Sequence, residues 1–252
     1  MSNTPPREAS AGRAREGHAS GEKDSFLAGI VYAVREIIII VAMAVVLSLA
    51  VKTWIAQAFY IPSGSMKDTL AVGDRVMVSK LHTRFADVSR GDIVVFKDPG
   101  GWLPPPVAAE PRNEFLGHVQ TALTFVGLLP DPADEHLIKR VIGVGGDHVV
   151  CCDEQSRITV NGAPINEPYL YPGDAASALR FDITVPADRV WVMGDHRSNS
   201  QDSRYHPLDG DGTQGSVPLD LVVGRSVVTV WPFNHLKTLP NYPDVFAPVP
   251  AP

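Results

Sequence analysis

Cysteine is scarce in this sequence: only two of the 252 residues are cysteine, and they are the neighbours Cys151 and Cys152. No C-x-x-C pair and no Cys/His spacing typical of zinc occurs, so we expect no structural metal and no metal or other cofactor in a functional site. Neighbouring Cα atoms lie about 3.8 Å apart across a trans peptide, below the usual disulfide range of roughly 4.4–6.8 Å. We therefore expect two thiols near a strand end, with a vicinal disulfide as the alternative.

Concentrated positive charge is also missing. The chain has 22 Lys and Arg against 28 Asp and Glu, a formal net charge of −6, and no long basic cluster. Because phosphate binding needs concentrated positive charge, these features argue against nucleic acid as the main partner. The 22 prolines disfavour an all-helical fold.

One long apolar run is present, within "REIIIIVAMAVVLSLAVKTWIAQAF". Residues 37–51 are apolar except for Ser48, and at 1.5 Å per residue they span about 22 Å of a hydrocarbon core that is roughly 30 Å thick. Lys52 would then lie near the outer interface, with its ammonium group reaching outward beside Trp54. We predict a transmembrane helix over residues 35–58 and a membrane anchor in contact with the lipid bilayer.

Two alternatives exist for this run. The Ala56-Gln57-Ala58 pattern is compatible with a cleaved secretory signal, and with self-cleavage after Ala58, although the polar region before the run is long for a signal. A buried helix of a soluble protein is the other alternative.

The region before the run, residues 1–34, is predicted to be a disordered cytoplasmic tail, because its first 25 residues have almost no large apolar side chains. Its positive charges set the orientation: the positive-inside tendency places the N-terminus in the cytoplasm and the chain after about residue 58 outside. The residues concerned are Arg7, Arg13, Arg15, Lys23 and Arg35.

The outer part, residues 59–235, reads as a mainly β domain. Val- and Ile-rich runs at 74–81, 91–99, 137–150, 157–162, 182–186, 189–195 and 222–232 alternate with Gly, Asn-Gly and Pro turns. Many short strands at this spacing predict an antiparallel sheet folded as a sandwich or barrel.

Two segments depart from this pattern. Residues 98–136 resemble an insertion, in which 113–129 has helical spacing and could cap the β core or touch lipid. Residues 236–252 form a Pro-rich C-terminal tail, which we expect to be extended or disordered.

A polar turn follows the membrane segment directly, in "FYIPSGSMKDTL". It is either a linker or the site of a nucleophile, Ser63 or Ser65, because a serine hydroxyl becomes a nucleophile beside a suitable base. Lys139 is a candidate base, since it lies in the apolar run "HLIKRVIGVGG" and half-burial would lower its pKa. A strand lysine whose ammonium group reaches solvent is the alternative. The dense polar loop "MGDHRSNSQDSR", residues 193–204, could orient a reactive amine.

The motifs "IPSGSMKDTL", "GDRVMVSK", "GDIVVF", "IKRVIGVGGD" and "MGDHRSNSQDSR", in this order after a membrane segment, closely resemble the conserved motifs of the bacterial type I signal peptidases. The resemblance covers residues 37 to about 232 and implies a membrane-anchored serine endopeptidase with a Ser-Lys dyad. It implies Ser65 as the nucleophile and Lys139 as the general base, with Ser63 and the backbone N–H of Ser65 forming the oxyanion hole. Ser200 would hydrogen-bond the catalytic amine, and Asp202 and Arg204 would support the site.

The resemblance also implies substrates and a location. The substrates would be exported preproteins whose signal peptides end in small residues of the Ala-X-Ala type, at the outer face of the bacterial cell membrane beside the protein export machinery. Shallow substrate pockets would be lined by Phe59, Ile61, Met66 and Ile138, for which core packing is the alternative.

His196 stands where the family often has Asn, which raises a histidine base as in the Ser-His eukaryotic relatives; the intact "IKR" argues against it. Two other functions compete with the signal peptidase. A self-cleaving Ser-Lys regulator would carry a DNA-binding domain, for which the sequence has no motif. An inert anchored β domain that binds an envelope partner would tolerate replacement of Ser65 and Lys139.

Overall fold

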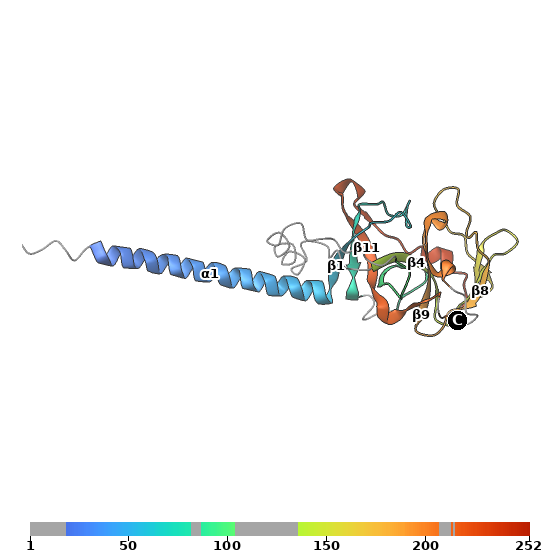
Figure 1. Cartoon of the computed structure of the whole chain (residues 1–252), viewed down its shortest axis with the longest axis horizontal. Coiled ribbons are helices and arrows are strands. Elements are labelled where there is room, and N and C mark those ends of the chain that lie inside the picture. Colours follow the sequence, from blue (N-terminus) through green and yellow to red (C-terminus); the bar gives the residue numbers. More distant parts are fainter. Residues whose placement is uncertain (1–18, 82–86, 104–135, 207–212, 214) are drawn as a thin grey trace, which may run out of the picture. The chain divides into compact units, whose positions relative to one another are not determined.

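The computed structural model describes residues 19–81, 87–103, 136–206, 213 and 215–252 (Figure 1). The chain divides into two compact units, Met1–Leu47 and Ser48–Pro252. The predicted helix at 113–129, with most of the predicted insertion, lies outside the described residues.

The N-terminal helix α1 covers Ala19–Trp54, so it begins 16 residues before the predicted start at 35. The predicted disordered tail was therefore wrong for residues 19–34: α1 continues through them, and the stretch "FLAGIVYAV" at 26–34 lengthens the apolar run toward the N-terminus. Within α1, Gly29–Trp54 is long and apolar enough to cross a membrane.

The end of the predicted span also differs. The helix ends at Trp54, and strand β1 begins at Ala56, where Ala56, Gln57 and Ala58 pair with Ser79, Val78 and Met77 of β2. Removal of residues 1–58 would delete most of β1 from its sheet, which argues against the cleaved-signal alternative.

The second unit contains two antiparallel sheets, as the sequence predicts. The larger has the order β1-β2-β11-β3-β4-β9-β10, with β12 paired to β11, and the smaller has the order β7-β6-β5-β8. The larger sheet consists of β1 Ala56–Tyr60, β2 Arg75–Ser79, β3 Ile93–Lys97, β4 His136–Val144, β9 Arg189–Met193, β10 Val217–Pro218, β11 Val222–Trp231 and β12 Lys237–Thr238. The smaller consists of β5 His148–Cys151, β6 Ile158–Val160, β7 Ala163–Pro164 and β8 Phe181–Thr184.

Short helices complete this unit. They are η1 Arg197–Asn199, η2 Ser203–Tyr205, η3 Leu219–Leu221, η4 Phe233–His235 and α4 Pro243–Phe246. The predicted strand 137–150 is two strands, β4 and β5, because the chain turns at Gly146, which has φ 91°, and Asp147 N–H donates to Val144 O at 2.9 Å.

Buried apolar clusters hold the segment after β1 and strand β9 in place. One apolar cluster joins Ile61, Met66 and Leu70, which follow β1, to the strands beneath them. A second joins the smaller sheet to Trp191 and Met193 of β9. Fully burying each such side chain stabilises the fold by about 1.5–3 kcal/mol, so the segment after β1 is held by its apolar residues rather than free as a linker.

The C-terminal segment corrects a prediction. Residues 236–252 are not an extended or disordered tail: they contain β12 and α4, and Leu239, Phe246 and Val249 are buried in the core. The apolar side chains between the prolines, not the prolines, decide where this segment lies.

The cysteines also differ from the preferred prediction, because Cys151 and Cys152 are joined by a disulfide bond rather than present as two thiols. The vicinal alternative is the one found.

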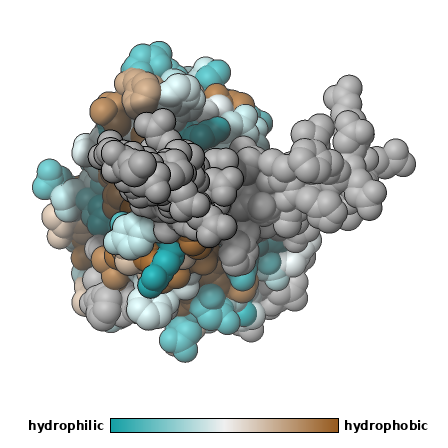
Figure 2. All heavy atoms as spheres, turned by 90° about the vertical axis from the view of Figure 1, so that its left-hand side faces the viewer, coloured by the Kyte–Doolittle hydropathy of each residue, from teal (hydrophilic) through white to brown (hydrophobic). Residues whose placement is uncertain are grey.

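Figure 2 shows that hydrophobic and hydrophilic residues lie side by side on one face of the molecule. Exposed apolar side chains of the second unit include Trp231, Phe233 and Leu236.

Candidate active site

Ser65 and Lys139, the two residues singled out from the sequence, lie in contact. The Nζ atom of Lys139 is 2.5 Å from the Oγ atom of Ser65. Ser65 is in the turn after β1 and Lys139 is in the middle of β4, where it pairs with Val94 of β3, so 74 residues of sequence separate the pair. Both side chains are buried, with exposed fractions of 5% and 3%.

The turn that carries Ser65 has a fixed backbone. Ile61 N–H donates to Asp74 O and Gly73 N–H donates to Ile61 O, both at 2.9 Å, which continues the β1–β2 pairing into the turn. Leu70 N–H donates to Met66 O at 2.7 Å, and the side chains of both are buried. The apolar residues point into the core, and Ser65 is held against β4.

Burial changes the basicity of Lys139. It lowers the pKa of the amine from 10.5 to about 8, while the negative charges of Asp202 and Asp195 act in the opposite direction and Arg204 lowers it further. The sequence predicts half-burial, and the structure shows nearly complete burial. An amine with a pKa of about 8 is neutral in about one molecule in ten at pH 7 and in half of the molecules at about pH 8.

Ser63 lies beside the pair but is exposed. Its Oγ atom is 3.3 Å from Oγ of Ser65. Among the described residues, the backbone N–H of Ser65 donates to no protein acceptor, whereas its carbonyl accepts from His196 N–H at 3.0 Å. One hydroxyl and one backbone N–H are therefore available next to the Ser65 hydroxyl.

The loop after β9 holds a buried ion pair. Arg204 Nε donates to Asp202 Oδ1 and Arg204 Nη2 donates to Asp202 Oδ2, both at 2.8 Å. Burial acts to raise the pKa of Asp202, but the hydrogen bonds and charge of Arg204, with the N–H of Gly194 and the hydroxyl of Ser200, outweigh it and lower that pKa. Asp202 therefore stays charged, near the amine of Lys139.

Ser200 lies next to Asp202, and its implied hydrogen bond to the amine of Lys139 stays a prediction. Its hydroxyl donates to Asp202 Oδ2 at 2.7 Å, and that carboxylate is the link from Ser200 toward Lys139. Ser200, Asp202 and Arg204 are thus brought together at the site.

His196 is not placed as a base for Ser65. Its Nδ1 atom lies 3.2 Å from the backbone carbonyl oxygen of Gly64, and its ring stacks on Tyr171 with centroids 4.1 Å apart. Because a carbonyl only accepts, Nδ1 is the protonated nitrogen in this contact.

Sequence reasoning missed a second buried pair. Arg140, next to Lys139, donates from Nε and Nη2 to Asp195 Oδ1 and Oδ2 at 2.8 and 2.7 Å, and both side chains are fully buried. Thr69, in the turn of Ser65, donates to Asp195 Oδ2 at 2.5 Å. Asp195 could be named from the sequence as a partner in an ion pair, but its partner, 55 residues away, could not.

The four predicted pocket residues belong to one apolar cluster. Ile61, Met66 and Ile138 are buried, with exposed fractions of 1%, 0% and 7%, and Phe59 is half-buried against them. Core packing therefore explains Ile61 and Met66, while Phe59 keeps exposed surface. Among the described residues, no group of three or more His, Cys, Asp or Glu side chains could hold a metal ion.

The chain is similar to known proteins over most of its length. Residues 34–231 match the family described as "Signal peptidase, peptidase S26". It is 40% identical to a probable signal peptidase I of Mycobacterium leprae over 78% of this chain and 76% of the relative. It is 40% identical to a signal peptidase I of Mycobacterium tuberculosis, covering 79% and 72%, and 36% identical to that of Leptolyngbya laminosa, covering 80% and 83%. The chain therefore belongs to the peptidase S26 family of signal peptidases and is a serine peptidase.

Proposed function

We propose that this chain removes the N-terminal signal peptides of exported preproteins at the outer face of a bacterial cell membrane, with Ser65 as nucleophile and Lys139 as general base. The observation that carries the proposal is the buried contact between Lys139 Nζ and Ser65 Oγ at 2.5 Å. The names of the relatives, signal peptidase I, support the substrate class.

The first step is the transfer of a proton. The charged amine of Lys139 can only donate a hydrogen bond to Ser65 Oγ, whereas the neutral amine can accept one from the Ser65 hydroxyl. The neutral amine therefore accepts the hydroxyl proton of Ser65. Oγ then attacks the carbonyl carbon of the scissile peptide bond, and the ammonium of Lys139 later gives the proton to the leaving amine.

The attack places negative charge on the carbonyl oxygen. The N–H of Ser65 and the hydroxyl of Ser63 are the two donors beside Oγ, and we assign them to this oxyanion. Each donor in such a site contributes roughly 2.7–4 kcal/mol of transition-state stabilisation. A water molecule then attacks the acyl carbon while Lys139 accepts one of its protons. The bond from that carbon to Ser65 Oγ breaks and Lys139 gives the proton to Oγ, which releases the product acid and restores the Ser65 hydroxyl.

The loop that carries Ser200, Asp202 and Arg204 acts on the amine of Lys139 through the carboxylate of Asp202. The charge of this carboxylate opposes the effect of burial on the pKa of Lys139, and Ser200 and Arg204 hold the carboxylate by hydrogen bonds. Without this charge the amine would be still less basic.

The apolar cluster next to the pair accounts for a preference for small residues. We assign Phe59 and Ile138 to the surface that meets the substrate, with Ile61 and Met66 packed behind them. A tightly packed surface of this kind leaves room for alanine-sized side chains before the cut and excludes larger ones.

The membrane location follows from α1. Gly29–Trp54 could span the bilayer, and the positive residues before it, such as Arg15 and Lys23, orient the N-terminus to the cytoplasm. Eleven residues lead from Trp54 to Ser65, so even a fully extended chain keeps the nucleophile within about 40 Å of the end of the helix. Exported preproteins emerge near this surface, beside the export machinery.

The test uses the full chain in detergent with a preprotein substrate. Ser65→Ala and Lys139→Ala should each abolish cleavage, whereas the matched controls Ser198→Ala and Lys97→Ala, which change exposed residues, should cleave normally. Cleavage by Ser65→Ala would overturn the nucleophile. Cleavage by Lys139→Ala with loss in His196→Ala would instead favour a histidine base.

A further inference from the structure

The C-terminal segment from Leu239 to Pro250 runs across the second unit and is fastened at both ends. Leu239 is buried at its start, and Phe246 and Val249 are buried near its end. The carbonyl of Pro250 accepts from Arg90 Nη2 at 3.1 Å and from Asn161 Nδ2 at 3.0 Å. This segment lies outside residues 34–231, which match the family.

The middle of the segment contacts Arg140. Arg140 Nη1 donates to Pro240 O at 3.2 Å and to Gly91 O at 2.8 Å. The ring of Tyr242 lies 5.3 Å from the Arg140 Cζ atom, and the ring of Tyr169 lies 4.1 Å from it. A guanidinium group over aromatic faces at these distances is attracted to them, more strongly where water is excluded.

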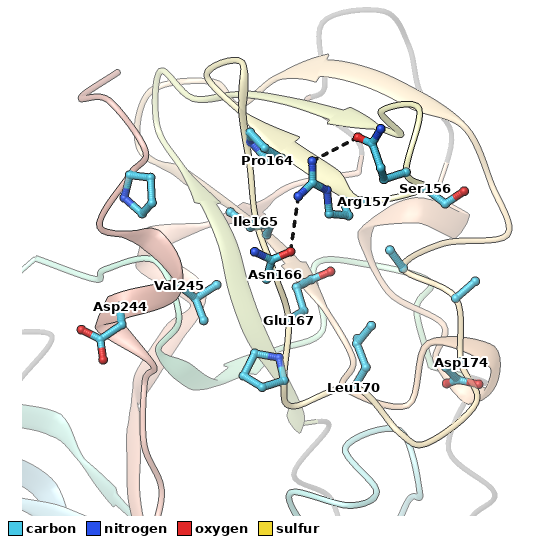
Figure 3. Close-up of a pocket in the computed structure, with 15 residues that line it drawn as sticks. Ser156, Arg157, Pro164, Ile165, Asn166, Glu167, Leu170, Asp174, Asp244 and Val245 are labelled. Atoms are coloured by element: carbon cyan, nitrogen blue, oxygen red, sulfur yellow. Dashed lines mark hydrogen bonds between the residues drawn. The ribbon is translucent and has the colours of Figure 1, made fainter.

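Gly91 leaves room for the C-terminal segment to approach Arg140. A Cβ atom at Gly91 would collide with the backbone carbonyl oxygen of Asn241, so the segment can approach β3 only because residue 91 is glycine. Figure 3 shows the next part of the segment, where Val245 lies beside Ile165 and forms one wall of a pocket of about 730 Å³. The segment therefore touches the turn before β3 at Asn241 and borders this pocket at Val245.

Arg140 in turn reaches the turn of Ser65. Its guanidinium group is paired with both oxygens of Asp195, and Asp195 Oδ2 accepts from Thr69, four residues after Ser65. Arg140 is also the strand neighbour of Lys139. The contacts form one continuous series: Tyr242 and Pro240, then Arg140, then Asp195, then Thr69.

We propose that the segment 239–250 is a positioning element for the peptidase reaction, in which Tyr242 and the carbonyl of Pro240 hold Arg140 so that Asp195 fixes the turn of Ser65. This inference rests on the proposed roles of Ser65 and Lys139. Tyr242 contacts Arg140, the strand neighbour of Lys139, so it acts through Arg140 and is a positioning residue.

Loss of the Tyr242 ring has one expected effect on the reaction. The turn of Ser65 gains freedom, which lowers kcat more than it raises KM, since a small misplacement of reacting groups is costly.

The experiment measures kcat and KM of preprotein cleavage by the full chain in detergent. Tyr242→Ala should lower kcat roughly tenfold with KM within about twofold. Tyr242→Phe keeps the ring and should restore kcat. Asp244→Ala, two residues away with an exposed side chain, is the matched control and should leave kcat and KM unchanged.

Two outcomes overturn the inference. One is a Tyr242→Ala enzyme that loses thermal stability but keeps its kcat per folded molecule; the other is a Tyr242→Phe enzyme that fails like Tyr242→Ala. If Tyr242→Ala does not fold, Tyr242→Leu keeps the bulk, removes the aromatic face and decides the question by the same readouts. Ser65→Ala is assayed in parallel: retained cleavage there refutes the dyad, whereas its loss with a normal Tyr242→Ala enzyme refutes only the positioning role.

Discussion

The amine of Lys139 meets the hydroxyl of Ser65 at 2.5 Å in a place that water barely reaches. The amine and the hydroxyl come from distant parts of the sequence, and both are buried in contact with each other. Burial of the amine has consequences for both activity and stability, and these consequences can be measured separately.

Cleavage should depend on pH through Lys139. The pKa of its amine is lowered to about 8, and the neutral form is the one that accepts a proton. Below pH 8, kcat/KM should therefore fall about tenfold per pH unit, and above pH 8 it should approach a plateau. The measurement is a pH profile of preprotein cleavage between about 6 and 10. A flat profile over this range contradicts a lysine base, and Lys97→Ala serves as the control whose profile should not move.

Stability should improve when Lys139 is replaced by methionine. The unfolded amine has a pKa near 10.4 and the folded amine has one of about 8, so the folded state binds the proton less tightly. The lower proton affinity reduces the free energy of unfolding by about 3 kcal/mol at every pH below 8. The reduction shrinks as pH rises from 8 and is nearly gone by about pH 10.5. Allowing about 1 kcal/mol for the lost contact with Ser65, Lys139→Met should be about 2 kcal/mol more stable at pH 7.

Urea unfolding of the two proteins in detergent at pH 7 and pH 10.5 checks this expectation. The variant should lose its advantage at the higher pH. An advantage that is equal at both pH values would mean that better packing, not the removed amine, is the cause.

The sequence predicts the dyad well but the surroundings of the dyad poorly. Ser65 and Lys139 are found because each lies in a short local motif. Alternation along one strand predicts half-burial of Lys139, yet β4 lies between β3 and β9 and is covered on both faces, which no local pattern reveals. Arg140 and Asp195 are 55 residues apart, and their pairing depends on the sheet order.

The ends of the chain show the same limit. A composition rich in proline suggested a disordered tail after residue 235, but three buried apolar residues, Leu239, Phe246 and Val249, decide its position. At the other end, Ala56–Tyr60 was assigned to the anchor and the start of the turn, because it continues an apolar run, and only its pairing with β2 makes it a strand. Tertiary contacts outweigh local composition in both places.

Replacement of Asp202 by asparagine should move the pH profile of cleavage. The charge of Asp202 raises the pKa of Lys139 and Arg204 lowers it, so loss of the carboxylate charge lowers that pKa below about 8. The acidic limb of kcat/KM should move to lower pH. Arg204, 4% exposed, is left without its carboxylate, which should cost about 3–5 kcal/mol of stability.

The pH profile and the urea unfolding curve of Asp202→Asn test these two effects together. Asp182→Asn is the control, because Asp182 is an exposed carboxylate whose side chain is 71% exposed. A limb that moves upward in Asp202→Asn would show that Asp202 does not act on Lys139 through its charge.

Thr69 offers the sharpest test of the link between the turn of Ser65 and Asp195. Its hydroxyl donates to Asp195 Oδ2 at 2.5 Å, and a hydrogen bond to a charged group contributes about 1.5–3 kcal/mol. Thr69→Val keeps the shape and removes the donor, whereas Thr69→Ser keeps the donor and removes a methyl group. If the hydrogen bond fixes the turn, Thr69→Val should lose both stability and kcat, and Thr69→Ser should retain most of each. Loss in Thr69→Ser with retention in Thr69→Val would mean that the methyl group and its packing position the turn.

Because Thr69 and Tyr242 act on the same Arg140–Asp195 pair, the double variant Thr69→Val, Tyr242→Ala should lose less kcat than the product of the two single losses.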